Sequence, residues 1–355
     1  MNFTLPKAAP LALAAVLAAG PMAAIAPSAA FAVPAGGYGD LVEAVSPAVV
    51  FIEVTTEAKP ANFNGIPGFP APEGPMRAQQ GLGSGFIISS DGKIVTNHHV
   101  VDGAQTVTVK LADGRSFDAK VIGSDKATDI AVLKIEADVD LPSITFGDST
   151  TIRAGDEVVA VGNPFGLGGS VTSGIISATS RNINAGPFDD FIQTDAAINR
   201  GNSGGPLFNN AGEVIGVNTA IISPGGGSVG IGFAVPSQLV QDIVADLSDD
   251  GMVTRGWLGV QIRPMTDEVA DVLGYDAPKG AVIEAVADDS PARKAGLEKG
   301  DIILSFAGQP ITELRDLTRA VALTDPDATA AITVFRKGTE VSLDVTIGTL
   351  AAQDA

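Results

Sequence analysis

The sequence predicts a mainly β protein, in which an all-β sandwich or barrel precedes a small α+β domain. Short apolar runs of strand length recur between residues 81 and 235, separated by turn signals such as 90–92 and 112–114. The 42 glycines and 22 prolines suit many turns, and residues 81–235 contain no convincing ten-residue helix. Beyond residue 255 the pattern becomes a mixture of strands and short helices, which indicates a second domain.

Composition limits the classes of function. With 355 residues, of which 45% are hydrophobic, the chain is long enough for about two domains, each with its own core. The net charge of −19 argues against a nucleic-acid partner, because phosphate binding needs a basic surface. Cysteine is absent, which excludes disulfides, thiolate metal sites and a cysteine nucleophile. The two histidines, His98 and His99, are adjacent, so histidine chemistry must use one of them.

Residues 1–32 are predicted to be a secretory signal peptide. Lys7 supplies the positive start, residues 11–19 form an apolar run, and the small-x-small site at 30–32 predicts cleavage after Ala32. The alternative is an uncleaved inner-membrane anchor, but the apolar run is short for a span and prolines interrupt its extension. The mature chain is therefore expected to be exported.

The first predicted domain, residues 33–252, consists of short strands and one closing helix. The segment 106–111 alternates apolar and polar residues with a period of two, and residues 56–80 form a long flexible loop. A helix is predicted over 237–248, with Ser237 as its N-cap and Gly251 as its stop. The predicted strands are 48–54, 85–88, 93–96, 106–111, 115–122, 130–135, 157–162, 171–178, 213–217 and 230–235.

The second predicted domain spans residues 255–350. Its strands are expected at 257–262, which has a glycine inside it, and at 281–286. A short helical turn at 290–297 and a helix from 313 to about 323 follow, and the domain ends in a hairpin turning at 337–339.

One glycine-framed serine is the strongest chemical signal. Ser203 lies in the run 199–205 among Gly201, Gly204 and Gly205, which leave backbone N–H groups open to a ligand. We interpret Ser203 as a nucleophile whose oxyanion is stabilised by the amides of Gly201 and Ser203. The alternative is an ordinary tight turn in a β protein.

A serine needs a base, and the order of candidates along the chain discriminates among hydrolase types. The histidines at 98–99 precede Asp129, which precedes Ser203. The α/β-hydrolase elbow fails, because that fold needs alternating helices and a histidine after the serine. The subtilisin order and a Ser-Lys dyad are also unsupported, and adjacent strand histidines would not reach one metal ion.

These motifs resemble the HtrA/DegP (DegQ-like) family of exported serine endoproteases, from about Val45 to the C-terminus. The resemblance implies a chymotrypsin-like double six-stranded β-barrel for 33–252 and one circularly permuted PDZ domain for 255–350. It implies no cofactor and no metal. The motifs that carry it are residues 81–88, 96–100, 127–133, 161–166, 191–196, 199–205 and 224–234.

The resemblance assigns the catalytic roles residue by residue. His99, immediately before a valine, matches the general base, while His98 falls at a variable position. Asp129 would orient His99 and Ser203 would attack. The oxyanion hole would be the loop Gly201, Asn202 and Ser203, with Asn202 shaping the turn between the two donating amides.

The resemblance also implies a substrate site. Ala197 stands uncharged where trypsin-like enzymes select charge, which implies cleavage after small aliphatic residues. Arg181 resembles a regulatory sensor residue, with an ordinary solvated arginine as the alternative. The substrate-binding residues would be Ile198, Thr219, Ala220, Ile221, Ile222 and Ser223.

In the PDZ domain the resemblance implies binding of peptide C-termini by strand addition. The alternative is an ordinary core strand. A homotrimer, or a higher oligomer of trimers, is also implied, with Tyr38 and Phe51 as candidate contacts and a place in the core as the alternative for each. The predicted peptide-binding residues are Trp257, Leu258, Gly259, Val260, Gln261 and Ile262.

The function implied is an ATP-independent periplasmic serine endopeptidase that degrades misfolded or damaged exported proteins. Its partners would be unfolded polypeptides and C-terminal peptides. The alternatives are a periplasmic chaperone or holdase, and a regulatory sensor protease with one specific substrate.

Overall fold

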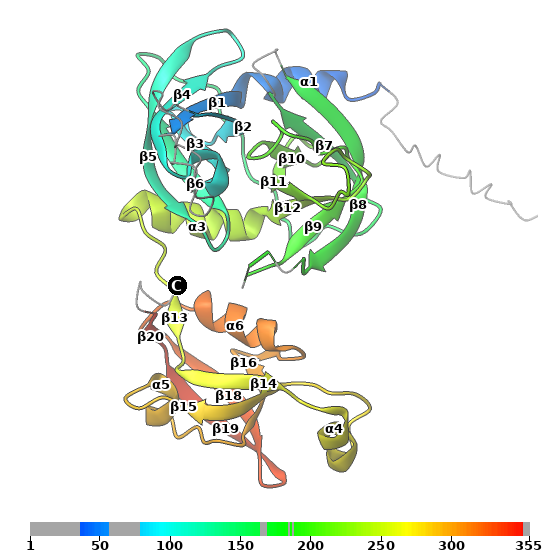
Figure 1. Ribbon diagram of the computed structural model, residues 1–355, viewed down its shortest axis with the longest axis vertical. Coiled ribbons are helices and arrows are strands. Elements are labelled where there is room, and N and C mark those ends of the chain that lie inside the picture. The colour runs from blue at the N-terminus through cyan, green and yellow to red at the C-terminus, as the bar shows by residue number, and fades with distance from the viewer. Residues whose placement is uncertain (1–35, 57–78, 164–168, 184, 187, 351–355) are drawn as a thin grey trace, which may run out of the picture.

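The computed structural model describes residues 36–56, 79–163, 169–183, 185–186 and 188–350 (Figure 1). The predicted signal peptide, and the predicted loop at 56–80 except for its ends, lie outside these residues. None of the helices in the described part of the chain is long and apolar enough to cross a membrane.

The first domain is built from two closed six-stranded antiparallel barrels, which lie side by side in Figure 1. The first barrel closes in the order β1-β2-β3-β6-β5-β4 and the second in the order β10-β11-β12-β9-β8-β7. The strands of the first are β1 (Val49–Thr56), β2 (Gln79–Ile87), β3 (Lys93–Asn97), β4 (Ala104–Lys110), β5 (Ser116–Asp125) and β6 (Ile130–Ile135). Those of the second are β7 (Glu157–Gly162), β8 (Ser170–Arg181), β9 (Phe191–Thr194), β10 (Pro206–Phe208), β11 (Val214–Ile221) and β12 (Gly232–Pro236).

These barrels confirm the predicted fold class. Along β4, Val107 and Val109 are buried while their neighbours are not, which is the predicted alternation. Strands β9 and β10 were not among the predicted strands. With four and three residues, they are too short to show a periodic pattern in the sequence. Aliphatic residues and phenylalanine fill the interiors, and Ile52, Phe86 and Leu133 are fully buried in the first barrel.

Helix α3 (Ser237–Asp249) closes the first domain and packs a stripe that includes Leu239, Val240 and Leu247 against a core to which both barrels contribute. The predicted N-cap is wrong by one residue. Pro236 occupies the cap position, and the Ser237 hydroxyl instead donates to the Gly147 carbonyl at 2.6 Å. The N-terminal elements α1 (Gly39–Val45) and η1 (Ser46–Ala48) lead into β1.

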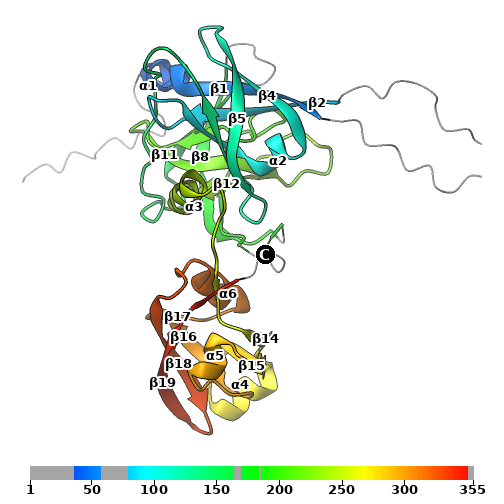
Figure 2. The same cartoon turned by 90° about the vertical axis from the view of Figure 1, so that its left-hand side faces the viewer.

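The second domain contains a mainly antiparallel sheet in the order β14-β15-β16-β18-β19, and it lies below the barrels in Figure 2. Its sheet strands are β14 (Val260–Pro264), β15 (Ala281–Val286), β16 (Ile302–Phe306), β17 (Gln309–Pro310), β18 (Thr329–Arg336) and β19 (Thr339–Thr346). A separate pair, β13 (Gly256–Trp257) and β20 (Gly348–Thr349), joins its two ends. Its helices are α4 (Asp267–Leu273), α5 (Pro291–Lys294) and α6 (Leu314–Ala322).

The predicted strand at 257–262 is interrupted, which corrects the sequence interpretation. Gly259 has a φ of +79°, a left-handed conformation, and a Cβ there would lie 2.3 Å from Ser290 Cβ. The chain therefore turns between β13 and β14. As a result, β14 becomes an edge strand of the sheet, in contact with α6.

Candidate active site

The serine run forms a tight turn between β9 and β10. The Asn202 amide donates to the Asn199 carbonyl at 3.0 Å, which closes a four-residue turn. Gly201, its third residue, has a φ of +101°, as a type II turn requires. The next turn follows at once, because Gly205 N–H donates to the Asn202 carbonyl at 2.9 Å. This double turn places Ser203 outside any strand.

Gly204 lets the serine loop lie directly against the first barrel. Its φ is +84°, and a Cβ there would lie 2.2 Å from the Ser84 carbonyl oxygen and 2.3 Å from Thr96 Oγ1. The Ser84 amide donates to the Ser203 carbonyl at 2.9 Å. Glycine at 204 therefore allows the close approach that brings Ser203 to the end of β3.

The two histidines follow β3 and begin a single helical turn, α2 (His98–Val101). The sequence had placed them at the end of a strand, so this is a correction; on a helical turn, successive side chains point about 100° apart. His98 Nδ1 lies 3.1 Å from Ser124 Oγ, whereas His99 Nδ1 lies 2.7 Å from Asp129 Oδ2. The two rings therefore have different partners.

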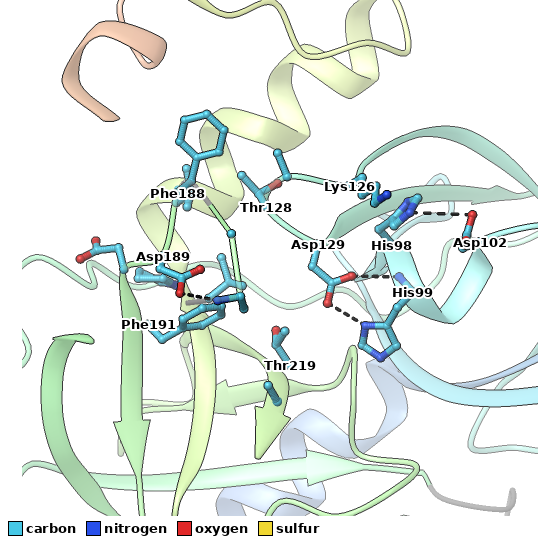
Figure 3. Close-up of a pocket in the computed structure, with 18 residues that line it drawn as sticks. His98, His99, Asp102, Lys126, Thr128, Asp129, Phe188, Asp189, Phe191 and Thr219 are labelled. Carbon is cyan, nitrogen blue, oxygen red and sulfur yellow. Dashed lines mark hydrogen bonds and ion pairs between the residues drawn. The ribbon is translucent and has the colours of Figure 1, made fainter. Parts of the chain in front are cut away.

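Asp129 holds His99 at two points, as the dashed lines in Figure 3 show. Its Oδ2 contacts the ring Nδ1, and its Oδ1 accepts from the His99 backbone N–H at 2.9 Å. This two-point contact fixes both the position of the ring and the nitrogen that faces the carboxylate. The other ring nitrogen, Nε2, is then directed away from Asp129.

Asp129 adopts a left-handed backbone conformation, with a φ of +58°. Such a conformation is uncommon for a residue with a side chain and persists where the surroundings stabilise it. Here the Asp129 carbonyl accepts from the His98 amide at 3.0 Å and from Asn97 Nδ2 at 2.8 Å. Asn97, fully buried, also donates to Thr219 Oγ1 at 3.0 Å. Sequence reasoning missed these supporting roles of Asn97 and Thr219.

Ser203 is linked through Thr219 to the pocket that His99 and Asp129 line. The Ser203 hydroxyl donates to the Thr219 carbonyl at 3.5 Å, and Thr219 lines the pocket with His99 and Asp129 (Figure 3). Within the described residues the hydroxyl makes this bond and none to His99. The hydrogen bond that a nucleophile and its base share during attack is thus not formed in this structure, as is common without substrate.

The amides of the serine loop divide into two kinds. The Asn202 N–H is used inside the turn, whereas those of Gly201 and Ser203 have no acceptor within the described part of the chain. The Asn202 side chain is 3% exposed and packs against Gly162, where a Cβ would lie 2.6 Å from its oxygen. Asn202 therefore supports the turn, and two neighbouring amides stay open.

The predicted substrate residues lie mainly along the end of β11. A register shift between Asn218 and Ala220 leaves Thr219 at an irregularity in its pairing with β12. Ile221 is half-buried, Ile222 is 50% exposed, and Ser223 follows them. Ile198 differs, because at 1% exposure its side chain belongs to the core of the second barrel.

Two further predicted residues or segments lie away from the pocket. Arg181 is exposed at the end of β8, beside Ser180, whose φ is +54°. In the predicted peptide-binding segment, the carbonyls of Leu258 and Gly259 accept from the amides of Ala292 and Ala287, both at 2.9 Å.

No metal site is formed by the described residues, because no three of their His, Cys, Asp or Glu side chains gather as such a site requires.

Comparison with known families defines the class. A family model described as a trypsin-like peptidase domain matches residues 83–217, and one described as a PDZ domain matches residues 256–347. Together with the double barrel and the contact between Asp129 and His99, these matches define a serine-type endopeptidase of trypsin-like fold with a PDZ domain.

The chain belongs to the HtrA family of DegP-like periplasmic serine endoproteases. It is 47% identical over 356 residues to "Probable periplasmic serine endoprotease DegP-like" of Brucella suis biovar 1 (strain 1330), which covers 89% of this chain and 69% of that one. The relative of the same description in Rhizobium meliloti (strain 1021) is 50% identical over 281 residues, 79% of this chain and 56% of that one.

Solved structures agree with this assignment. The HtrA-type protease AlgW, solved with a decapeptide, is 42% identical with a TM-score of 0.73, over 89% of this chain and 99% of that one. The serine endoprotease from Yersinia pestis is 36% identical with a TM-score of 0.63, over 89% and 98% of the two chains.

Proposed function

We propose that this chain is an ATP-independent periplasmic endopeptidase of misfolded or damaged exported proteins, with His99, Asp129 and Ser203 as its catalytic residues. The two-point contact of Asp129 with His99 is the observation that carries the proposal, together with the serine turn whose Gly201 and Ser203 amides have no acceptor within the described residues. The periplasmic location follows the names of the relatives, and export would include cleavage of the signal peptide after Ala32.

The geometry supports general-base attack by a serine. With Asp129 holding Nδ1–H, His99 Nε2 is left as the acceptor for the Ser203 proton. Ser203 Oγ then adds to the scissile carbonyl, and the negative oxygen that forms accepts from the Gly201 and Ser203 amides. His99 next protonates the leaving amine, and water releases the acyl group by the same steps in reverse order.

The substrate would lie along residues 219–223. In the described structure Ile222 N–H donates to Ile231 at 3.2 Å, while the exposed Ile222 side chain offers apolar contact beside the cleft. Ala197 contributes no charge. We expect cleavage after small aliphatic residues, with Ile198 and Ile221 as candidate lining residues of the pocket that receives them.

The PDZ domain is proposed to bind peptide C-termini along β14, through the segment from Trp257 to Ile262. Edge strands offer unpaired backbone groups to an added strand. The structural neighbours were solved with a decapeptide and with a tripeptide, which supports peptide binding. Arg181 is proposed to report peptide occupancy to the active site, and titration with C-terminal peptides tests this by measuring peptidase activation in the parent and in Arg181→Ala.

A homotrimer, or a larger assembly of trimers, is proposed as the working unit. Phe51 is only 4% exposed, so it belongs to the core, and Tyr38 is left as the candidate aromatic contact. Light scattering of the parent and of Tyr38→Ala measures this directly. A monomeric parent would contradict the proposal.

Cleavage of unfolded casein by Ser203→Ala tests the catalytic assignment. We expect activity to fall by at least about 10⁴-fold with an unchanged unfolding midpoint. Undiminished cleavage would overturn the assignment. The same variant separates proteolysis from holdase activity. Suppression of client aggregation by Ser203→Ala would show a holdase role that is independent of cleavage.

A further inference from the structure

Asn199 joins two loops at the active site. Its backbone carbonyl accepts from Asn202 N–H at 3.0 Å and closes the turn that carries Gly201. Its side-chain Oδ1 accepts from the backbone N–H of Ser228 at 2.9 Å. Ser228 belongs to the loop 223–230, which directly follows the proposed substrate strand. One residue therefore touches both the turn and the loop.

The other hydrogen bonds of this loop in the described structure are internal to it: Gly225 N–H donates to Ser223 Oγ at 3.3 Å, and Gly230 N–H donates to Ser228 Oγ at 3.4 Å. A Cβ added at Gly225, Gly226 or Gly230 would meet nothing within 4 Å, so no other segment packs on that side of these residues. At Gly227 the one atom within 4 Å is Asn199 Oδ1, at 3.9 Å. The Asn199 side chain is thus the contact that fixes the middle of this glycine-rich loop against the serine turn.

The turn itself needs a restraint. Types I and II differ by a flip of the central peptide, which here is the peptide between Arg200 and Gly201. Glycine at 201 tolerates both forms, so its freedom alone does not choose where the Gly201 N–H points. A fixed Asn199 anchors the first residue of the turn and favours one form.

We propose that Asn199 is a positioning residue, whose side chain ties the loop 223–230 to the turn 199–202 and so holds the Gly201 N–H toward the reacting carbonyl. The proposal rests on the oxyanion role of Gly201 proposed above. Asparagine is also common as the first residue of simple turns, where its side chain bonds to the turn's own backbone. Here the oxygen instead accepts from the backbone of Ser228, in a separate loop 29 positions along the chain, so the side chain links two loops rather than forming its own turn.

The test compares Asn199→Ala with Ser228→Ala on a peptide substrate. Asn199→Ala keeps the turn carbonyl and removes only the acceptor of the tie, while Ser228→Ala keeps the backbone donor and serves as the matched control. We expect Asn199→Ala to lower kcat by about 10- to 100-fold with KM changed less than about three-fold, because displacement of a stabilising group costs on this scale. Ser228→Ala should stay within about two-fold of the parent.

A second readout separates positioning from a merely structural role. A peptide boronic acid forms a tetrahedral adduct that uses the oxyanion amides, whereas the same peptide as an amide does not. The Ki of the boronic acid should rise in Asn199→Ala by the same factor as kcat falls, with amide binding and the unfolding midpoint unchanged. Asn199→Asp, which keeps an acceptor oxygen, should retain most of kcat and remains informative if the alanine variant folds poorly.

Three outcomes would overturn the positioning role of Asn199. The first is a kcat in Asn199→Ala within about two-fold of the parent, and the second is an equal loss of kcat in Ser228→Ala or in Asn199→Asp. The third is a parallel weakening of boronic acid and amide binding in Asn199→Ala. Failure of the underlying function is seen separately, as casein cleavage that survives Ser203→Ala.

Discussion

Arg255, in the linker between the domains, forms a buried ion pair with Asp125 of the first barrel, with Nη2 2.6 Å from Oδ2. Their side chains are 7% and 8% exposed. The same carboxylate accepts from the Thr128 amide at 3.0 Å, and Thr128 immediately precedes Asp129. Arg255 also lies over the Phe188 ring, 4.7 Å from its centroid. The linker thus supports the turn that carries the proposed catalytic carboxylate.

Replacement of Arg255 by alanine should therefore affect both stability and catalysis. The change leaves the buried Asp125 carboxylate without its positive partner, which should lower the free energy of unfolding by about 3–5 kcal/mol. The loosened 125–128 turn should also lower kcat, measured on a peptide beside urea unfolding. Arg263→Ala, which breaks the exposed pair with Glu284, is the control and should cost at most about 1 kcal/mol. Equal effects of the two variants would contradict this reading.

The contact between Asp129 and His99 makes Asp129→Asn the sharpest test of the base. An amide can still accept from the His99 backbone, but its NH₂ group favours the wrong ring tautomer, so we expect kcat to fall about 10⁴-fold. The unfolding midpoint should hardly move. Asp102→Asn is the matched control, since Asp102 stands 3.9 Å from His98 and its side chain is 69% exposed. A loss of activity in both variants would argue against His99 as the base.

Local patterns were enough to predict most of the strands, apart from the short β9 and β10 and the break at Gly259, and to propose the chemical groups. The period of two in β4 and the order of His99, Asp129 and Ser203 are properties of the sequence itself. The family resemblance then supplied the double barrel, because closure depends on pairings between distant strands that no local pattern contains.

The supporting contacts could not be predicted, since each joins segments far apart in the chain. Asn97 reaches Thr219 across 122 positions, and Arg255 reaches Asp125 across 130. The break at Gly259 depends on Ser290, which the strand pattern does not contain. The resemblance gives Ile198 as an apolar residue that lines a pocket, and only the three-dimensional structure shows that its side chain is buried.

The close approach at Gly204 predicts an asymmetric response to alanine. Gly114 has nearly the same backbone, with a φ of +89° against +84°, but nothing lies within 4 Å of its added Cβ. Gly114→Ala should therefore cost only the left-handed strain, about 1–2 kcal/mol. Gly204→Ala adds overlap with the Ser84 backbone and should cost more than about 4 kcal/mol and abolish cleavage. Equal unfolding free energies for the two variants would refute the packing argument.

The C-terminal end of α3 predicts a pH-dependent gain in stability. The pKa of Asp246 is raised by burial first, and then by Asp325, Asp250 and Asp242. Asp242, Asp246 and Asp250 are spaced four residues apart, and negative charge is unfavourable at a helix C-terminus. Because the folded pKa exceeds the unfolded one, the Asp246 contribution to stability falls as pH rises from about 4 through the folded pKa.

Asp246→Asn removes this charge and should stabilise the fold at pH 7 by roughly 0.5–1 kcal/mol, with no gain below about pH 4, where the parent carboxyl is also neutral. Asp316→Asn should show the opposite sign. Burial alone would raise the pKa of Asp316, but hydrogen bonds from Thr312 and the backbone of Glu313 and Thr312 lower it overall. That variant should lose about 1 kcal/mol at pH 7, and progressively less as pH falls below the unfolded pKa and through the lower folded pKa. Urea unfolding of both variants at pH 7 and pH 4 measures the two trends, and trends of the same sign would contradict the assignment.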